Sequence, residues 1–126
     1  MKKNVKATNI ELTPAIDDYL DRRFSAFDRF IKEDSAATCL VEVGKTTKHH
    51  KSGDVFRAEV NLTISGKNFY AFSEKDDLYA AIDEVKDEIV YQLSSYKDKT
   101  MTLMRKGALK VKNMVRGLGD RTDRRK

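Results

Sequence analysis

The sequence has 126 residues, enough for one domain with a buried core, and 36% of its residues are charged. Its single cysteine, Cys39, excludes an internal disulfide framework and a cysteine-based zinc cluster, and it favours a reducing compartment. No apolar run approaches the roughly 20 residues that cross a bilayer, and the first residues lack the apolar stretch of a signal peptide, so we expect a cytoplasmic protein.

Charge is distributed unevenly along the chain. Residues 1–96 hold 14 Lys or Arg and 17 Asp or Glu, a net charge of −3, whereas residues 97–126 carry a net charge of +8. A slightly acidic body with a basic end is typical of proteins that bind nucleic acids, although a solvated, disordered end explains the pattern equally well. We expect one domain over 1–99 and a basic, partly disordered tail over 100–126, disordered from residue 120 onward.

The first forty residues predict a strand followed by a helix. Residues 4–11 form a short segment bounded by turn-forming residues, which indicates an edge strand. Thr13 and Pro14 then predict a helix start, with the threonine as N-cap and the proline at the first helical position. The helix is expected to end at about residues 30–32. Its apolar residues recur at spacings of three and four: Ile16, Tyr19, Leu20, Phe24, Phe27 and Ile31.

Two stretches of alternating residues predict two further strands. The first places Cys39, Val41 and Val43 on one face. The second, residues 56–65, is the strongest signal in the sequence, because five apolar positions alternate with five polar ones. The apolar set is Phe56, Ala58, Val60, Leu62 and Ile64, and the polar set is Arg57, Glu59, Asn61, Thr63 and Ser65. Such alternation is typical of an antiparallel sheet that is covered on one side only.

The last part of the predicted domain contains a turn, a strand and a second helix. Residues 65–68 read as a tight turn and residues 69–72 as a fourth strand. Asp76 and Asp77 precede a second amphipathic helix of nearly twenty residues. Its apolar stripe comprises Leu78, Ala81, Ile82, Val85, Ile89, Leu93 and Tyr96. After Lys97 the apolar pattern weakens, and glycines interrupt what remains of it.

The predicted order is therefore β-α-β-β-β-α. Both amphipathic helices need an apolar surface, and packing them on the same face of the sheet provides one. The sequence thus predicts the α+β class: a two-layer sandwich with a four-stranded mixed sheet and both helices on one face. The first two strands are expected to be parallel, because a helix connects them.

Residues that would support catalysis or metal binding are sparse. The sequence contains neither a GxxxxGK phosphate loop nor a GxGxxG motif. His49 and His50 are adjacent between two lysines, and Asp54 is the only further ligand nearby, so a solvated basic loop explains them better than a metal site. Cys39 alternates with core positions and is expected to be a core residue. We therefore expect no enzyme activity, no cofactor, no metal and no small-molecule substrate.

Clustered cations make binding to nucleic acid the best remaining explanation, because phosphates need cations on a rigid scaffold and little sequence-specific geometry. Each lysine taken alone is more simply explained as a surface residue that aids solubility. A membrane-surface role for the basic tail is disfavoured because the tail lacks aromatic residues. The candidate RNA-binding residues are Arg22, Arg23, Arg29, Lys32, Lys45, Lys48, His49, Lys51, Lys86, Lys97, Lys99, Arg105 and Lys106.

Two segments carry a resemblance to a known family. The first is the run NIELTPAI at residues 9–16, followed by Tyr19 and Arg23. The second is the run DLYAAID at residues 77–83, followed by Gln92-Leu93 and Lys97-Asp98-Lys99. Over about residues 1–100 the sequence resembles the short form of the ribosome hibernation-promoting factor and ribosome-associated inhibitor family.

The resemblance implies the fold predicted above and a non-enzymatic role in translation regulation. It implies binding to the small ribosomal subunit in the decoding channel, to 16S rRNA and the ribosomal proteins of that cleft, where messenger RNA and A- and P-site transfer RNA would lie, in stationary phase or stress. Residues carried over from the family are Arg23, Arg29, Lys45, Lys97 and Lys99. The alternative is a general RNA-binding module that uses the basic tail and is not specific for ribosomes.

The sequence also departs from that family in several places, among them Asp17, Asp18 and Asp21 on the first helix and the basic tail. Family members often carry several Lys or Arg in the middle and end of the second helix, where this chain has Asp87, Glu88, Tyr91 and Ser95. Long members have an extra C-terminal domain that pairs two ribosomes, and the roughly thirty residues after the second helix are too few to form one.

Overall fold

The computed structural model describes residues 1–33, 35–46 and 53–117, with side chains up to residue 100 and at Leu103. The chain divides into two compact units, Met1–Leu93 and Ser94–Lys126. Its elements are strand β1 (Lys2–Thr8), helix α1 (Pro14–Phe24), 3₁₀ helix η1 (Ser25–Phe30), strands β2 (Ala37–Thr46), β3 (Val55–Ile64) and β4 (Lys67–Lys75), and helix α2 (Leu78–Gly117).

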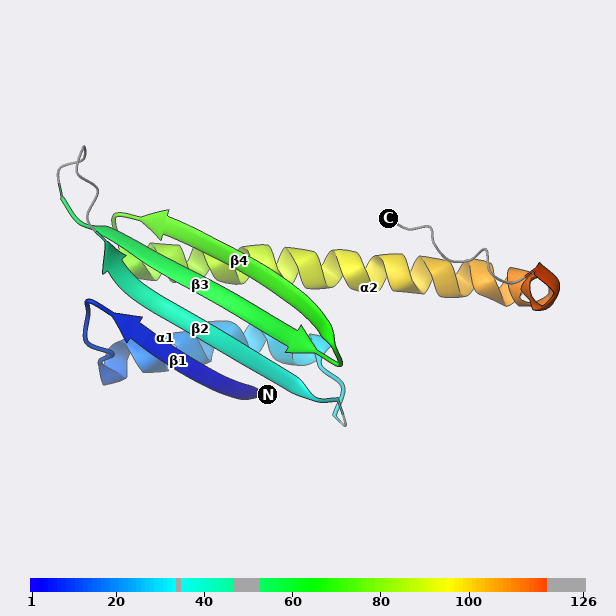
Figure 1. Cartoon of the computed structure of the whole chain (residues 1–126), viewed down its shortest axis with the longest axis horizontal. Helices are drawn as coiled ribbons and strands as arrows, with labels where there is room; N and C mark the ends of the chain where they lie inside the picture. Colours follow the sequence, from blue (N-terminus) through cyan, green and yellow to red (C-terminus); the bar gives the residue numbers. More distant parts are fainter. Residues whose placement is uncertain (34, 47–52, 118–126) are drawn as a thin grey trace. The chain divides into compact units, whose positions relative to one another are not determined.

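The four strands form one mixed sheet in the order β1-β2-β3-β4. Strand β1 runs parallel to β2, with Val5 opposite Val41, and the two later pairings are antiparallel. Helix α1 and the first turns of α2 lie on the same face of the sheet, as Figure 1 shows. The predicted α+β sandwich, with both helices on one side and parallel first strands, is confirmed.

The core lies between the sheet and the helices. The inward side chains of β2 and β3 are those that the alternation predicts, including Cys39, Val60 and Leu62, and all three are fully buried. Along α2 the predicted stripe is buried from Leu78 to Leu93. Tyr96 departs from the prediction, because its side chain is 45% exposed. The buried stripe therefore ends where the first compact unit ends.

Helix α1 begins as predicted but ends earlier. The Oγ1 atom of Thr13 accepts the backbone N–H of Ile16 at 3.2 Å, and Pro14 occupies the first turn. After Phe24 the chain continues as a 3₁₀ helix rather than as the α-helix expected to residues 30–32. A 3₁₀ helix has three residues per turn, so Phe24 and Phe27 align on one face, where their rings stack at 5.0 Å in the core.

Strands β1 and β4 depart most from their predicted bounds, and β3 covers Val55–Ile64 instead of 56–65. Strand β1 covers Lys2–Thr8 instead of 4–11, because Asn9 takes a left-handed conformation at φ 62° that ends the strand. Strand β4 covers Lys67–Lys75 instead of 69–72. The turn before it is tighter than predicted, since Ser65 (φ 50°) and Gly66 (φ 86°) alone connect β3 to β4, a geometry that suits a two-residue hairpin.

Helix α2 is fixed at its start and along β4. The carboxylate of Asp77 accepts the backbone N–H of Ala80 at 3.2 Å and caps the helix. The hydroxyl of Ser73 donates to the carboxylate of Glu84, and Gln92 Nε2 donates to the backbone carbonyl of Tyr70 at 2.9 Å. These contacts place one side of α2 against β4.

Helix α2 is also longer than the weakening pattern suggests, because it continues to Gly117. A single glycine costs a helix only about 1 kcal/mol, and the residues around Gly107 are mainly strong helix formers. The predicted disorder at 120–126 falls outside the described residues.

Gly44 on β2 is required by its neighbour on β1. A Cβ atom at this position would lie 2.8 Å from the backbone carbonyl oxygen of Thr8. We expect Gly44→Ala to destabilise the protein by about 1–3 kcal/mol, because the two paired strands must separate to admit the methyl group. Chemical denaturation measures the loss. Thr46→Ala on the same strand is the control, and an equal effect of the two changes would contradict the steric explanation.

Candidate nucleic-acid interface

The two adjacent arginines of α1 share one aromatic support. The guanidinium carbon atoms of Arg22 and Arg23 lie 5.5 Å and 5.8 Å from the ring centroid of Tyr19. Arg22 is exposed and pairs with Asp18, one turn earlier, at 3.4 Å. A pair this exposed contributes little to stability, so Arg22 remains able to exchange its partner for a phosphate.

Arg23 takes part in a contact between the two helices. Its Nε donates to Oδ1 of Asp83 on α2 at 2.8 Å, and the Tyr19 hydroxyl donates to the same oxygen at 2.7 Å. The ring of Tyr79 meets that of Tyr19 edge to face, with centroids 4.8 Å apart. We call Tyr19, Arg23, Tyr79 and Asp83 the interhelix cluster. The hydrogen bond to Asp83, together with burial, raises the pKa of Tyr19, which therefore stays protonated at neutral pH.

Lys86 lies beside this cluster. It follows Asp83 by one helical turn, so the two residues share one side of α2. Its side chain is only 19% exposed and pairs with Asp87 at 2.7 Å. Of the predicted residues, Arg22 and Arg23 thus lie at the contact between α1 and α2, and Lys86 lies one turn after Asp83 on the same side of α2.

Two further predicted cations lie beyond the end of α1. Arg29 belongs to η1 and places its guanidinium 4.7 Å from the ring centroid of Phe30. Lys32 is exposed two residues after η1. Both cations therefore remain at the surface of the helix layer, toward the C-terminal end of α1.

Lys45 is remote from Lys32. It lies near the C-terminal end of β2, where it pairs with Asp54 at 3.7 Å, whereas Lys32 precedes the start of the same strand. The neighbouring predicted residues, Lys48, His49 and Lys51, are outside the described residues.

The remaining predicted cations belong to the second compact unit. Lys97 and Lys99 are exposed on α2. Arg105 and Lys106 lie on the same helix, and their side chains are outside the described part of the chain.

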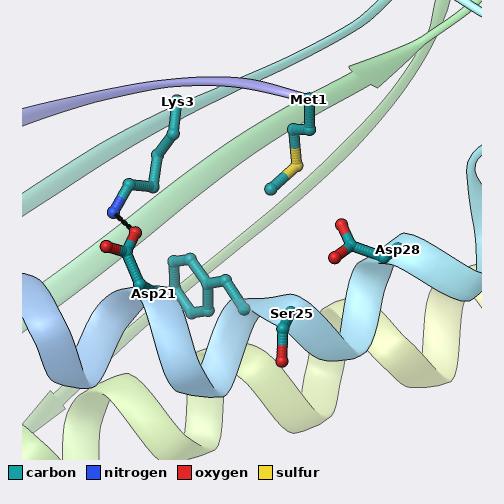
Figure 2. A pocket seen from close by; sticks show the side chains of 6 residues that line it. Met1, Lys3, Asp21, Ser25 and Asp28 are labelled. Atoms are coloured by element: carbon teal, nitrogen blue, oxygen red, sulfur yellow. Dashed lines mark hydrogen bonds and ion pairs between the residues drawn. The ribbon is translucent and has the colours of Figure 1, made fainter.

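Acidic residues flank the helix cations. Lys3 on β1 pairs with Asp17 at 3.5 Å and also with Asp21, and the latter contact is drawn in Figure 2. Asp21 and Asp28 both line a hollow of about 250 Å³ between the start of β1 and the α1–η1 segment. Lys3 lines the same hollow, but its ammonium group is already paired with carboxylates of α1, so among its described lining residues the hollow offers an anion two carboxylates and no unpaired lysine. Phosphate contacts on the helix layer are therefore expected away from β1, on the side of α1 that faces α2.

The uncovered face of the sheet carries charges of both signs. Arg57 lies 4.1 Å from the ring centroid of Phe72 and pairs with Glu74 at 3.4 Å and with Glu59 at 3.9 Å. The Tyr70 hydroxyl donates to Glu59 at 2.5 Å and this bond raises the pKa of Tyr70. Arg57 thus lies on the polar face that the alternation of β3 predicts, and its guanidinium is paired there.

The described residues contain no group of three or more His, Cys, Asp or Glu that could hold a metal ion. Cys39 is buried in the core, as predicted, and burial raises the pKa of its thiol to about 11. A thiol in this state is a poor nucleophile at neutral pH. Among the helices as described, none is both long and apolar enough to cross a membrane.

Sequence reasoning missed the role of Asp83. Tyr19, Arg23 and Asp83 all belong to the two segments that carry the family resemblance, so the signal was present. The sequence did not reveal that these residues are in contact, because 64 positions separate the tyrosine from the aspartate to which it donates a hydrogen bond.

Comparison with known proteins gives concordant matches. The family model described as "Sigma 54 modulation protein / S30EA ribosomal protein" matches residues 4–101. A protein named "Ribosome hibernation promoting factor" from Klebsiella oxytoca is 32% identical over 99 residues, which are 79% of this chain and 96% of that protein. The protein of the same name from Escherichia coli (strain K12) is 28% identical over the same shares of both chains. The crystal structure of the N-terminal domain of Thermus thermophilus Protein Y matches with a TM-score of 0.64 and 27% identity, over 76% of this chain and 99% of that one.

Proposed function

The chain belongs to the Sigma 54 modulation protein / S30EA ribosomal protein family, and we propose from this membership that it is a ribosome hibernation factor. The observation that carries the proposal is the 32% identity to a ribosome hibernation promoting factor over 96% of that relative's length. In this role the protein binds the small ribosomal subunit in the cytoplasm and inhibits translation in stationary phase or stress. It performs no reaction and uses no cofactor.

The proposed site on the ribosome is the decoding channel, with 16S rRNA and the ribosomal proteins of the cleft as partners. Bound there, the protein overlaps the positions of messenger RNA and of A- and P-site transfer RNA, so inhibition is competition for space. The supporting feature is the group of Arg22, Arg23 and Lys86 on a rigid helix layer, which suits phosphate contacts. Arg29 and Lys32 extend this group beyond α1.

A second candidate is a general RNA-binding module, and one observation favours it. Residues 97–126 carry a net charge of +8, and the family match ends at residue 101, so most of this basic segment lies outside the matched region. Cations outside the matched domain bind nucleic acids mainly through phosphate neutralisation, with little preference among RNAs. This candidate predicts equal affinity for ribosomal subunits and for bulk duplex RNA.

Cosedimentation with purified small ribosomal subunits separates the two candidates. We expect the full-length protein to pellet with free subunits at physiological salt in the presence of excess duplex RNA. The reason is that the ribosomal site would fit the shape of the protein as well as its charge, whereas duplex RNA offers only charge. Prior loading of the subunits with messenger RNA and P-site transfer RNA is expected to prevent binding. A variant in which Arg22, Arg29 and Lys32 are all changed to Gln tests the helix-layer cations. It lacks three exposed positive charges and is expected to bind subunits more weakly than the unchanged protein.

Two results would refute decoding-channel binding. One is binding that persists unchanged on subunits loaded with messenger and transfer RNA. The other is complete competition by duplex RNA, which would instead support the general RNA-binding module.

A further inference from the structure

Arg23 is held by one edge of its guanidinium group. Its Nε donates to Oδ1 of Asp83 at 2.8 Å, and the side chain is still 38% exposed. A guanidinium group has five N–H donors in a fixed planar fork, so a bond through Nε leaves four donors on the two terminal nitrogens. Arg23 can therefore keep its contact to α2 and bind a second acceptor at the same time.

The acceptor on α2 is itself held in place. Oδ1 of Asp83 also accepts the Tyr19 hydroxyl at 2.7 Å, and the ring of Tyr79 packs edge-on against Tyr19 at 4.8 Å. The same Tyr19 ring lies within 6 Å of the guanidinium carbons of Arg22 and Arg23. The orientation of Arg23 is thus restricted before any ligand arrives. Such preorganisation spares the conformational entropy that ordering a long side chain costs on binding.

We propose that the interhelix cluster is a preorganised binding site for one RNA phosphodiester, in which the terminal nitrogens of Arg23 bind the phosphate and Asp83 is a positioning residue. The inference rests on the RNA binding proposed above. Arginine suits this role because its fork can bind two phosphate oxygens at once, which a lysine cannot do. The adjacent Arg22 supplies a second cation over the same ring.

The proposal predicts an effect on RNA affinity that is opposite to the effect predicted from net charge alone. If carboxylates act only by repelling phosphates, removal of any one of them from the helix layer strengthens RNA binding. If Asp83 positions Arg23, its removal weakens binding although the protein becomes more positive. The sign of the change in affinity therefore distinguishes positioning from simple repulsion.

The test compares full-length variants for affinity to purified small ribosomal subunits at one fixed salt concentration. Asp83→Ala removes the acceptor oxygen and is expected to weaken binding about fivefold. Glu88→Ala is the charge-matched control, because Glu88 is exposed on the same helix and accepts a hydrogen bond from Gln92, and it is expected to bind as tightly as the unchanged protein or more tightly. Arg23→Ala is expected to weaken binding, and in that background Asp83→Ala is expected to weaken it no further.

Positioning is overturned if Asp83→Ala binds as tightly as the unchanged protein, or if it causes the same loss with and without Arg23. It is also overturned if Arg23→Lys, which keeps the charge but not the fork, binds like the unchanged protein. Failure of the unchanged protein to bind subunits would refute the proposed function and this inference together. The results named above, obtained with an unchanged protein that does bind, would refute this inference alone, so the two failures are distinguishable.

A readout that needs no ribosome guards against misfolding. The Nε–H signal of Arg23 in a ¹⁵N NMR spectrum is expected to exchange slowly with water in the free protein and quickly in Asp83→Ala, which lacks the acceptor oxygen. Tyr19→Phe removes one hydrogen bond to Asp83 and keeps the ring, and it is expected to fold and to weaken binding less than Asp83→Ala. Fast exchange of this signal in the unchanged protein would contradict preorganisation.

Discussion

Leu62→Asp is expected to destabilise the protein by at least about 4 kcal/mol, a large part of the 5–15 kcal/mol typical of a domain. The Leu62 side chain is fully buried on the face of β3 that the helices cover. Its neighbours across the sheet are Cys39 on β2 and Phe69 on β4, and both are buried and apolar. A carboxylate there has no partner, so it must either lose its charge or expose the core to water. Thermal and urea unfolding followed by circular dichroism measure the loss.

Thr63→Asp is the matched control, because it introduces the same side chain one residue later. Thr63 points to the uncovered face, where its neighbours across the sheet are the uncharged Thr38 and Asn68. We expect a cost below about 1 kcal/mol. Because successive strand residues point to opposite faces, equal losses in the two variants would mean that the faces of β3 are assigned wrongly.

The second large effect is expected from the C-terminal cations. Removing residues 100–126 takes away a net charge of +7 and leaves the compact unit Met1–Leu93 intact. We expect much weaker binding to small ribosomal subunits and a smaller dependence on salt, since fewer counterions are released from RNA. A sharper variant keeps the full length and changes Arg105, Lys106, Lys110 and Lys112 to Gln. If these four cations contact phosphates, the slope of log K against log salt falls by about 3.

A chain in which residues 100–126 are shuffled but keep their composition is the control for charge. It is expected to retain most of the affinity if the segment acts through phosphate neutralisation alone. Unchanged affinity and unchanged salt slope in the truncated and four-glutamine variants would show that the basic segment has no part in binding. Those results would leave the helix-layer cations as the whole interface.

The elements that could be predicted from the sequence are those with strong local causes. The alternation around Cys39 and Val60 indicated which faces of β2 and β3 are buried, because a strand has a strict period of two. Thr13 and Pro14 marked the start of α1, because a capping side chain and a fixed φ act within one turn. The end of α1 at Phe24 was not predicted, because aromatic residues three apart fit both an α-helix and the 3₁₀ helix that follows.

Long helices and strand ends were less predictable. The continuation of α2 to Gly117 depends on the summed preference of many residues, in which no single residue gives a clear signal. The bounds of β4 depend on its pairing with β3, since Lys67 and Lys75 join the strand opposite Ile64 and Phe56. Pairing partners distant in sequence are not visible in a local pattern.

For the site, the sequence identified the kind of residue but not its surroundings. The basic residues of α1 and the two family segments could each be identified directly in the sequence. The α+β sandwich could be predicted from hydrophobic periodicity, which is a local property. Only the tertiary structure decided which cations meet and which are already paired: Arg23 with Asp83, 60 positions apart, Lys45 with Asp54, and Lys3 with two aspartates of α1. Electrostatic contacts depend on distance in space, and the pairing of the strands and the packing of the helices on the sheet set that distance.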